Sequence, residues 1–252
     1  MKALILAAGR GSRLREQTDE RTKCMLPMFG KPLIQYSLEN AVRAGASEII
    51  VVVGYRAEQI INRFGIEFEG VRVQYVLQDN AQGLVHAIEC SKETIGCEDF
   101  MLFLADEILW APRHKEMVRQ FETEDLTVIC GVVHEPAPDE IRKTYAVIED
   151  DRDQRIYRLI EKPRKPPNDI RGTGNCIFRA VIFDYVPLTP INQNRSEKEL
   201  PDLIQCAIDD GLRVKSFDIG EGYVNINTPE DIAIAERENA QRFLGSAAAP
   251  EA

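Results

Sequence analysis

The sequence predicts an α/β fold in which a mostly parallel sheet lies between two layers of helices, and three observations lead to that prediction. Short, continuous apolar runs such as KALILAA (2–8) and EIIVVV (48–53) are typical of strands buried on both faces. The segment between them, PLIQYSLENAVRAG (32–45), spaces its apolar residues with a helical period. The same strand–helix alternation continues along the first half of the chain, which favours a Rossmann-like three-layer α/β/α arrangement.

The elements of the first half follow from local signals. The helix over 32–45 begins at Pro32, carries Ile34, Leu38, Ala41 and Val42 on one face, and ends at Gly45. The continuing alternation predicts three further helices and three further strands: helices over 55–64, 83–95 and 113–123, and strands over 71–77, 100–105 and 126–134.

The second half changes character and indicates an inserted, β-rich substrate-binding lobe. YAVIE (145–149) and RIYRLIE (155–161) flank the polar stretch DDRDQ, which predicts a hairpin. The remaining elements are expected as strands over 172–180 and 212–220 and helices over 199–211 and 229–244. No repeat or linker-like run divides the chain, so we expect a single domain over 1–244 with a mostly parallel, mixed sheet, followed by a flexible tail over 245–252.

The composition argues against several classes of protein. The formal net charge of the 252 residues is −10, so no overall field favours nucleic acid or an anionic membrane as a partner. No apolar run approaches the roughly 20 residues of a membrane span, and Met1–Ala8 is too short for a signal peptide. The six cysteines show no CxxC pair and the three histidines no metal-ligand spacing. We therefore expect a cytoplasmic protein with buried, reduced thiols and no zinc site.

The stretch LILAAGRGSRLREQTDERTKCMLP, near the start of the chain, predicts a phosphate-binding loop. A buried strand leads into this loop at the carboxyl edge of the sheet, where ligands of such folds bind. Gly9 and Gly11 allow backbone N–H groups to approach an anion, and Arg13 and Lys23 supply positive charge. The third glycine of the dinucleotide fingerprint is replaced by Leu14, and the GK[ST] of a P-loop is missing. An ordinary glycine-bearing loop is the alternative on these residues alone.

Six motifs, in the same order, resemble those of the sugar-1-phosphate nucleotidyltransferases. LAAGRGSRL…TKCMLPMFGKPLIQYSLE is similar to the signature LAAGxGTRL…PKxLxPxxxKPLIxY of that family. LQDNAQGLVHAIE is close to the form found in bacterial glucose-1-phosphate uridylyltransferases. The other motifs are FLADEI, YAVIE…RIYRLIEKP, TGNCIF and YVNINTPEDI, and together the six span residues 3–232. The resemblance implies the Rossmann-like fold of that family and transfer of a nucleotidyl group to a sugar 1-phosphate.

The resemblance also implies a nucleotide-binding part over 1–135. The residues that would lie against the nucleotide are Leu6, Ala8, Gly9 and Gly11, with Arg13 on its phosphates and Lys23 at the α-phosphate. Gln78 and Gly83 would recognise a pyrimidine base, so UTP or dTTP is the expected triphosphate. Asp106 would bind Mg²⁺, with Asn225 at the position of the second metal ligand.

A sugar-phosphate-binding part would cover 136–228 and be followed by a C-terminal helix over 229–244. Glu161 would accept hydrogen bonds from sugar hydroxyls, and Lys162 would hold the sugar phosphate. Ala146 and Gly174 would lie against the sugar ring. The resemblance thus makes Arg13, Lys23, Asp106 and Lys162 the catalytic residues, and it is compatible with a homo-oligomer.

Several positions depart from the motifs of the family and keep alternatives open. Thr22 replaces a proline, Ala105 and Ala146 replace glycines, Cys176 replaces an aromatic residue and Asn225 replaces an aspartate, as in the related N-acetylglucosamine-1-phosphate uridylyltransferases. One alternative is transfer of CMP to a non-sugar phosphate or phosphonate, or of GMP to a sugar phosphate, on the same fold. Another is a catalytically silent sugar-nucleotide sensor or regulatory subunit. On the residues alone, Asp106 could instead cap a turn and Glu161–Lys162 could be a solvated pair.

Overall fold

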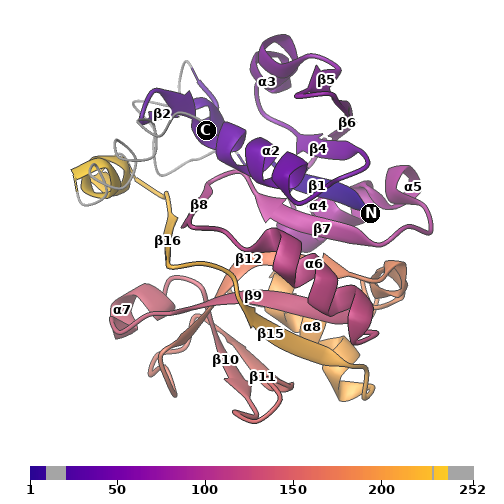
Figure 1. The fold of residues 1–252 in the computed structure, drawn as a ribbon, viewed down its shortest axis with the longest axis vertical. Helices are drawn as coiled ribbons and strands as arrows, with labels where there is room; N and C mark the ends of the chain where they lie inside the picture. The colour runs from indigo at the N-terminus through magenta and orange to yellow at the C-terminus, as the bar shows by residue number, and fades with distance from the viewer. Residues whose placement is uncertain (10–20, 229, 238–252) are drawn as a thin grey trace, which may run out of the picture.

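The computed structural model describes residues 1–9, 21–228 and 230–237, and its main feature is a mixed sheet that runs through the whole molecule (Figure 1). Within the described residues this sheet has ten strands, in the order β11-β10-β12-β7-β1-β4-β6-β5, with β9 beside β12 and β15 beside β9. The predicted α/β class with a mixed, mostly parallel sheet is confirmed.

The first half of the chain forms the parallel part of the sheet. Its strands are β1 (Lys2–Leu6), β4 (Ile49–Val53), β6 (Val71–Leu77) and β7 (Phe100–Leu104), with the short antiparallel β5 (Glu67–Phe68) at the edge. Alternate residues of β1 enter two separate cores: Leu4 and Leu6 pack on one face of the sheet, and Ala3 and Ile5 on the other. Burial of both faces explains why this strand is a continuous apolar run.

Helices cover both faces of this sheet. One face packs against α4 (Leu84–Cys90), α5 (Lys92–Ile95) and α8 (Leu200–Asp209), and the other against α2 (Leu33–Arg43), α3 (Ala57–Phe64) and α6 (His114–Thr123). On α2, the predicted apolar positions Ile34, Leu38 and Ala41 are fully buried. In the part of the chain that the structure describes, no helix is long and apolar enough to cross a membrane.

The second half adds an antiparallel lobe that shares a strand with the first half. The lobe contains β9 (Val128–His134), α7 (Pro138–Ile141), β10 (Tyr145–Glu149), β11 (Ile156–Glu161), β12 (Ile170–Phe178) and β15 (Val214–Asp218). The predicted hairpin is confirmed as the antiparallel pair β10–β11. Near its start β12 pairs with β10, and through residues 176–178 it pairs with β7. One strand therefore fixes the lobe to the parallel sheet (Figure 1).

Small elements complete the structure beside the sheet. They are the 3-10 helices η2 (Lys23–Met25) and η3 (Ala180–Asp184) and the two-stranded pairs β2 (Pro27–Met28) with β3 (Lys31–Pro32), β13 (Ile191–Asn192) with β14 (Glu197–Lys198), and β8 (Glu107–Trp110) with β16 (Gly222–Asn225). Residues 230–237 are helical, as predicted, and the rest of the helix expected over 229–244 lies outside the described residues.

Two expectations about local structure were wrong. The helix predicted over 83–95 is divided into α4 and α5 at Ser91, whose N–H and hydroxyl both donate to the carbonyl oxygen of Ile88 and form a turn. The thiols are free but not all buried, since Cys97 is exposed and Cys90 and Cys206 are partly exposed.

Candidate active site

Two adjoining cavities lie at the carboxyl ends of the parallel strands. The first has a volume of about 440 Å³, and the sequence-predicted residues that line it are Leu6, Ala8, Gly9, Lys23, Gln78, Gly83, Asp106 and Asn225. Residues from β1, η2, the segment after β6, the segment after β7 and β16 thus meet although they are far apart in the sequence. Gly11 and Arg13, also predicted here, lie outside the described residues.

The second cavity, of about 490 Å³, lies between the parallel sheet and the lobe. Glu161, Lys162 and Gly174 line it. From the sequence, these three residues are expected to bind the sugar phosphate together. Five residues line both cavities and form their shared wall: Leu84, Leu104, Arg195, Glu199 and Asn225. A ligand that occupies both cavities would therefore contact these five residues where it passes from one cavity to the other.

Asp106 and Asn225 are brought together by the β8–β16 pair. Asp106 directly precedes β8, Asn225 is the last residue of β16, and the N–H of Ile226 donates to the carbonyl oxygen of Asp106 at 2.9 Å. Nζ of Lys23 lies 2.5 Å from Oδ2 of Asp106. A lysine and an acidic side chain therefore face each other in the lining of the first cavity.

The donors at this position suit Mg²⁺. A carboxylate and an amide oxygen are hard ligands, which this ion prefers. Among the described residues, no group of three or more His, Cys, Asp or Glu side chains could hold a metal. A cation held by Asp106 and Asn225 would therefore take its other ligands from water and from substrate phosphate.

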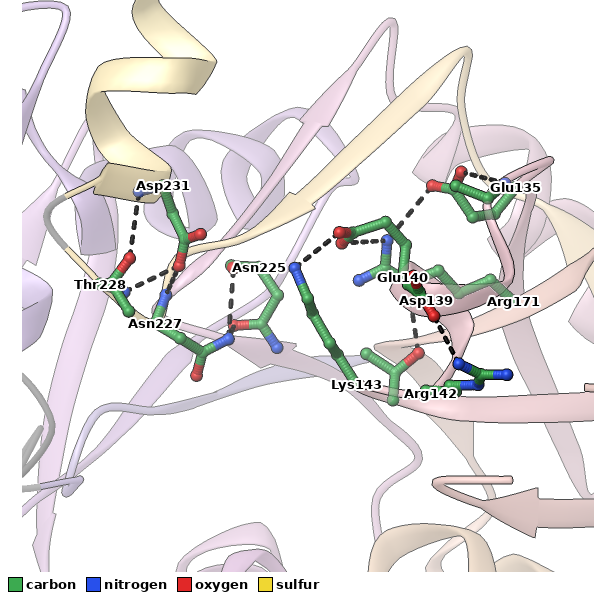
Figure 2. A network of polar contacts seen from close by, with 12 residues as sticks. Glu135, Asp139, Glu140, Arg142, Lys143, Arg171, Asn225, Asn227, Thr228 and Asp231 are labelled. Atoms are coloured by element: carbon green, nitrogen blue, oxygen red, sulfur yellow. Dashed lines mark hydrogen bonds and ion pairs between the residues drawn. The ribbon is translucent and has the colours of Figure 1, made fainter. Parts of the chain in front are cut away.

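Asn225 is itself held in place by a polar chain that leads to the C-terminal helix. Figure 2 shows Nδ2 of Asn227 donating to Oδ1 of Asn225, at 3.2 Å. The carboxylate of Asp231, near the start of the helical residues 230–237, accepts hydrogen bonds from the N–H groups of Asn227 and Thr228 at 2.7 and 2.8 Å. The start of this helix thus fixes the segment that carries Asn225.

Gln78 lines the first cavity and is held in place by hydrogen bonds to its neighbours. Its backbone N–H donates to the carbonyl oxygen of Val53, and its Nε2 lies 3.2 Å from the carbonyl oxygen of Gly83 and 2.9 Å from Nδ1 of His86. Gly83 has φ of +88°, a conformation that favours glycine. The amide side chain is therefore pre-oriented beside a glycine backbone. His86, which was not predicted as a site residue, helps to hold it there.

Charged side chains of both signs meet in the second cavity. Nζ of Lys162 lies 3.3 Å from Oε1 of Glu161, and Nη1 of Arg195 lies 3.1 Å from Glu199 and 3.8 Å from Glu161. Burial raises the pKa of Glu161 to about 7, in opposition to the lowering effect of Lys162. Lys162 also has φ of +43°, a strained conformation of the kind found at functional sites.

Arg195 was not predicted from the sequence. It lies between β13 and β14, within the polar run NQNRSEKE, which carries no period and no motif. Only the fold of this hairpin brings its guanidinium to the wall between the cavities.

Gly174 and Ala146 occupy different environments. A Cβ atom at Gly174 would lie 2.3 Å from Cγ of Leu104, so the close approach of β12 to β7 requires glycine there. Ala146 is fully buried opposite Arg171 and Ile160, and it is not among the residues that line either cavity. Successive side chains of a strand point to opposite faces, and Tyr145, its neighbour on β10, is the residue that lines the second cavity.

A buried arginine organises the outer side of the lobe. Arg171 is 2 % exposed, and its Nη1 lies 3.4 Å from Glu135 and 3.5 Å from Glu140. Figure 2 shows Glu140 between this arginine and Lys143, whose Nζ lies 2.6 Å from Oε1 of Glu140. Lys143 lines the second cavity, so the network extends to the site.

Comparisons with known proteins agree with this geometry. The family described as Nucleotidyl transferase matches residues 2–241. The chain is 35 % identical to UTP–glucose-1-phosphate uridylyltransferase AglF of Haloferax volcanii, over 94 % of this chain and 96 % of that protein. It is 32 % identical to the low-salt glycan biosynthesis nucleotidyltransferase Agl11 of the same organism, over 94 % of this chain. It is also 32 % identical to the glucose-1-phosphate thymidylyltransferase of Streptomyces griseus, over 86 % of this chain. The chain spans 65 % and 59 % of the lengths of these last two relatives.

The fold is also that of a solved structure. The structure of a UDP-glucose pyrophosphorylase complexed with UDP-glucose superimposes with a TM-score of 0.86 and 24 % sequence identity, over 96 % of this chain and 98 % of that one. The resemblance stated from the six motifs is thus confirmed across nearly the whole chain. The chain belongs to the nucleotidyl transferase family, as one of its sugar-1-phosphate nucleotidyltransferases.

Proposed function

We propose that this protein catalyses the Mg²⁺-dependent transfer of a nucleoside monophosphate from UTP or dTTP to a sugar 1-phosphate, giving an NDP-sugar and pyrophosphate. The observation that supports this most is the pair of adjoining cavities, which meet at Arg195 and Asn225. The part over 1–135 would bind the triphosphate and the part over 136–228 the sugar phosphate, as one domain.

The site residues suit this reaction because both reactants are anions. A phosphate oxygen of the sugar phosphate attacks the α-phosphorus, and pyrophosphate leaves in line, so charge neutralisation and alignment are the main requirements. Lys23 in the first cavity would neutralise the α-phosphate. Lys162 and Arg195 would hold the phosphate of the sugar in the second. When bound by Asp106 and Asn225, Mg²⁺ would draw charge from phosphate oxygens.

The choice of base provides the first test. Gln78 and the glycine backbone at Gly83 present amide groups to the first cavity, and such groups pair with the imide edge of uracil or thymine. We expect UTP or dTTP to be used at least about tenfold faster than ATP or GTP, which corresponds to roughly 1.4 kcal/mol. UTP and dTTP differ by the 5-methyl group and by the ribose 2′-hydroxyl. They should be used at similar rates, since one methyl group in an apolar pocket has a small effect and none of the proposed site residues is assigned to the 2′-hydroxyl.

Pyrophosphate release from a panel of triphosphates and sugar phosphates is the measurement. Faster release with GTP or ATP than with either pyrimidine would contradict the assignment of the base. CTP as the best donor would favour CMP transfer, and no release from any pair would favour a silent sensor of sugar nucleotides.

Glu161 should make the reaction depend on pH near neutrality. Its pKa is raised to about 7 by burial, so the carboxyl is protonated below that pH and ionised above it. The ionised carboxylate only accepts hydrogen bonds, whereas the protonated form carries an O–H donor on one oxygen. We expect kcat/KM for the sugar phosphate to rise about tenfold from pH 6 to pH 8, in proportion to the ionised fraction.

The Glu161→Gln variant is the control for this pH dependence. Its activity should be lower, and the ratio of wild-type to variant kcat/KM cancels the titration of the sugar phosphate itself. A ratio that stays constant between pH 6 and pH 8 would exclude Glu161 as the titrating group.

A further inference from the structure

Glu107 is a buried carboxylate that lines the second cavity, and the motifs assign it no role. Its residue is 5 % exposed. Oε1 lies 3.0 Å from the backbone nitrogen of Gly174 and 2.5 Å from the hydroxyl of Tyr223. Oε2 lies 2.9 Å from the same backbone nitrogen and 3.0 Å from Nδ2 of Asn175. Both oxygens are therefore occupied by donors of the protein.

The contact with Gly174 fills a gap in the main sheet. β12 pairs with β9 through residues 170–172 and again through 176–178, and the register shifts between Gly172 and Cys176. The N–H of Gly174 lies within this interruption. A buried N–H needs an acceptor, and the carboxylate of Glu107 supplies it.

The other contacts connect Glu107 with the pair of residues proposed to hold Mg²⁺. Glu107 is paired with Asn225 in the β8–β16 register, and it directly follows Asp106. Tyr223, which donates to Oε1, belongs to the same strand as Asn225. The ring of Tyr223 lies against the buried Arg171, whose Cζ is 4.6 Å from the ring centroid. This contact fixes the direction in which the Tyr223 hydroxyl points.

We infer that Glu107 is a positioning residue that sets the distance between the sugar-binding wall at Gly174 and the Asp106–Asn225 pair. One carboxylate joins β8, β12 and β16, which carry the residues on the two sides of the reacting phosphates. It acts through these strands rather than on the substrate, because its oxygens already accept hydrogen bonds from Gly174, Asn175 and Tyr223. This inference rests on the proposed function.

The test separates alignment of the sugar phosphate from binding of the triphosphate. Glu107→Ala, Glu107→Gln and Tyr223→Phe are assayed with UTP and glucose 1-phosphate, or with the fastest pair of the panel, well below their melting temperatures. For Glu107→Ala we expect kcat/KM for the sugar phosphate to fall about 10²-fold, as for a misplaced reactant. KM for the triphosphate, and its Kd by calorimetry, should change less than about threefold, because the hydrogen bonds of the Glu107 side chain go to Gly174, Asn175 and Tyr223 and not to residues proposed to bind the triphosphate.

The glutamine variant distinguishes positioning from a direct role of the charge. Its amide oxygen can accept from Gly174 and Asn175 while its NH₂ group donates to the hydroxyl of Tyr223. We therefore expect Glu107→Gln to recover kcat/KM to within about fivefold of wild type, and Tyr223→Phe to lose roughly three- to tenfold. If Glu107→Ala does not fold, Glu107→Gln and Tyr223→Phe still test the inference.

Three results would overturn the inference. The first is unchanged kinetics in Glu107→Ala or, if that variant does not fold, in Tyr223→Phe. The second is an equal rise of KM for both substrates, which would indicate general damage, and the third is a glutamine variant as inactive as the alanine variant. Failure of the proposed function is recognised separately, because the wild type itself would then release no pyrophosphate. A control from the same molecule is Glu149→Ala, which removes a half-buried carboxylate of β10 that lines neither cavity and should leave the rates unchanged.

Discussion

The Asp106→Ala variant is expected to lose kcat by about 10³-fold or more, because the only carboxylate of the proposed Mg²⁺ pair is removed. Asp106 lines the first cavity, paired with Lys23 and next to Asn225. Asn225→Ala should be milder, since the remaining carboxylate still binds the ion. Asn225→Asp should tighten Mg²⁺ binding and keep measurable activity, because an aspartate oxygen can still accept the hydrogen bond that Nδ2 of Asn227 now donates.

Pyrophosphate release measured against Mg²⁺ concentration tests these three variants. Asp99→Ala is a matched control, because Asp99 precedes β7 at the opposite end of the strand from Asp106 and its side chain is similarly exposed, 26 % against 30 %. It should keep wild-type turnover although it loses its ion pair with Arg179. Full activity in EDTA, or normal turnover of Asp106→Ala, would show that the metal assignment is wrong.

Elements with a strong local period could be predicted from the sequence, whereas elements defined by tertiary pairing could not. The helix over 33–43 and the strand over 49–53 agree with the predictions to within a few residues, because burial of an apolar face leaves a regular pattern. β8 and β16 were missed as a pair. Each has four residues, and their partnership across more than a hundred positions has no signal in either segment.

The candidate site shows the same limit. Motifs identified Asp106, Asn225, Glu161 and Lys162 because they recur in fixed sequence contexts, and the structure brings each of them to a cavity. Glu107 was not identified, because its importance comes from the interrupted ladder of β12 and not from its neighbours in the sequence.

The structure gives a physical reason for the departure at Thr22. Thr22 is fully buried, and its N–H donates to Oε1 of Gln59 at 3.0 Å, a hydrogen bond that the family's proline could not make. This contact holds the residue that precedes Lys23.

The Lys23→Ala variant is expected to lower kcat/KM by roughly 10²–10³-fold, because the ammonium neutralises phosphate charge in the transition state. The structure also predicts that the same substitution improves the binding of Mg²⁺ to the free protein. Nζ of Lys23 lies 2.5 Å from Oδ2 of Asp106, so it competes with a cation for that carboxylate. Loss of this ammonium should lower the Kd of the free protein for Mg²⁺ at least about threefold, since a repulsive charge is removed.

Lys215→Ala is the matched control for Lys23→Ala. The Lys215 side chain is 15 % exposed against 13 % for Lys23, and its Nζ lies 2.8 Å from Oε2 of Glu124, away from both cavities. It should change neither turnover nor Mg²⁺ binding. Pyrophosphate release measures the expected loss of turnover, and calorimetry with MgCl₂ measures the expected gain in Mg²⁺ affinity. If Lys23→Ala lost turnover and Mg²⁺ affinity in parallel, Lys23 would support the metal site rather than compete with it. A near-wild-type rate would place Lys23 outside the reaction.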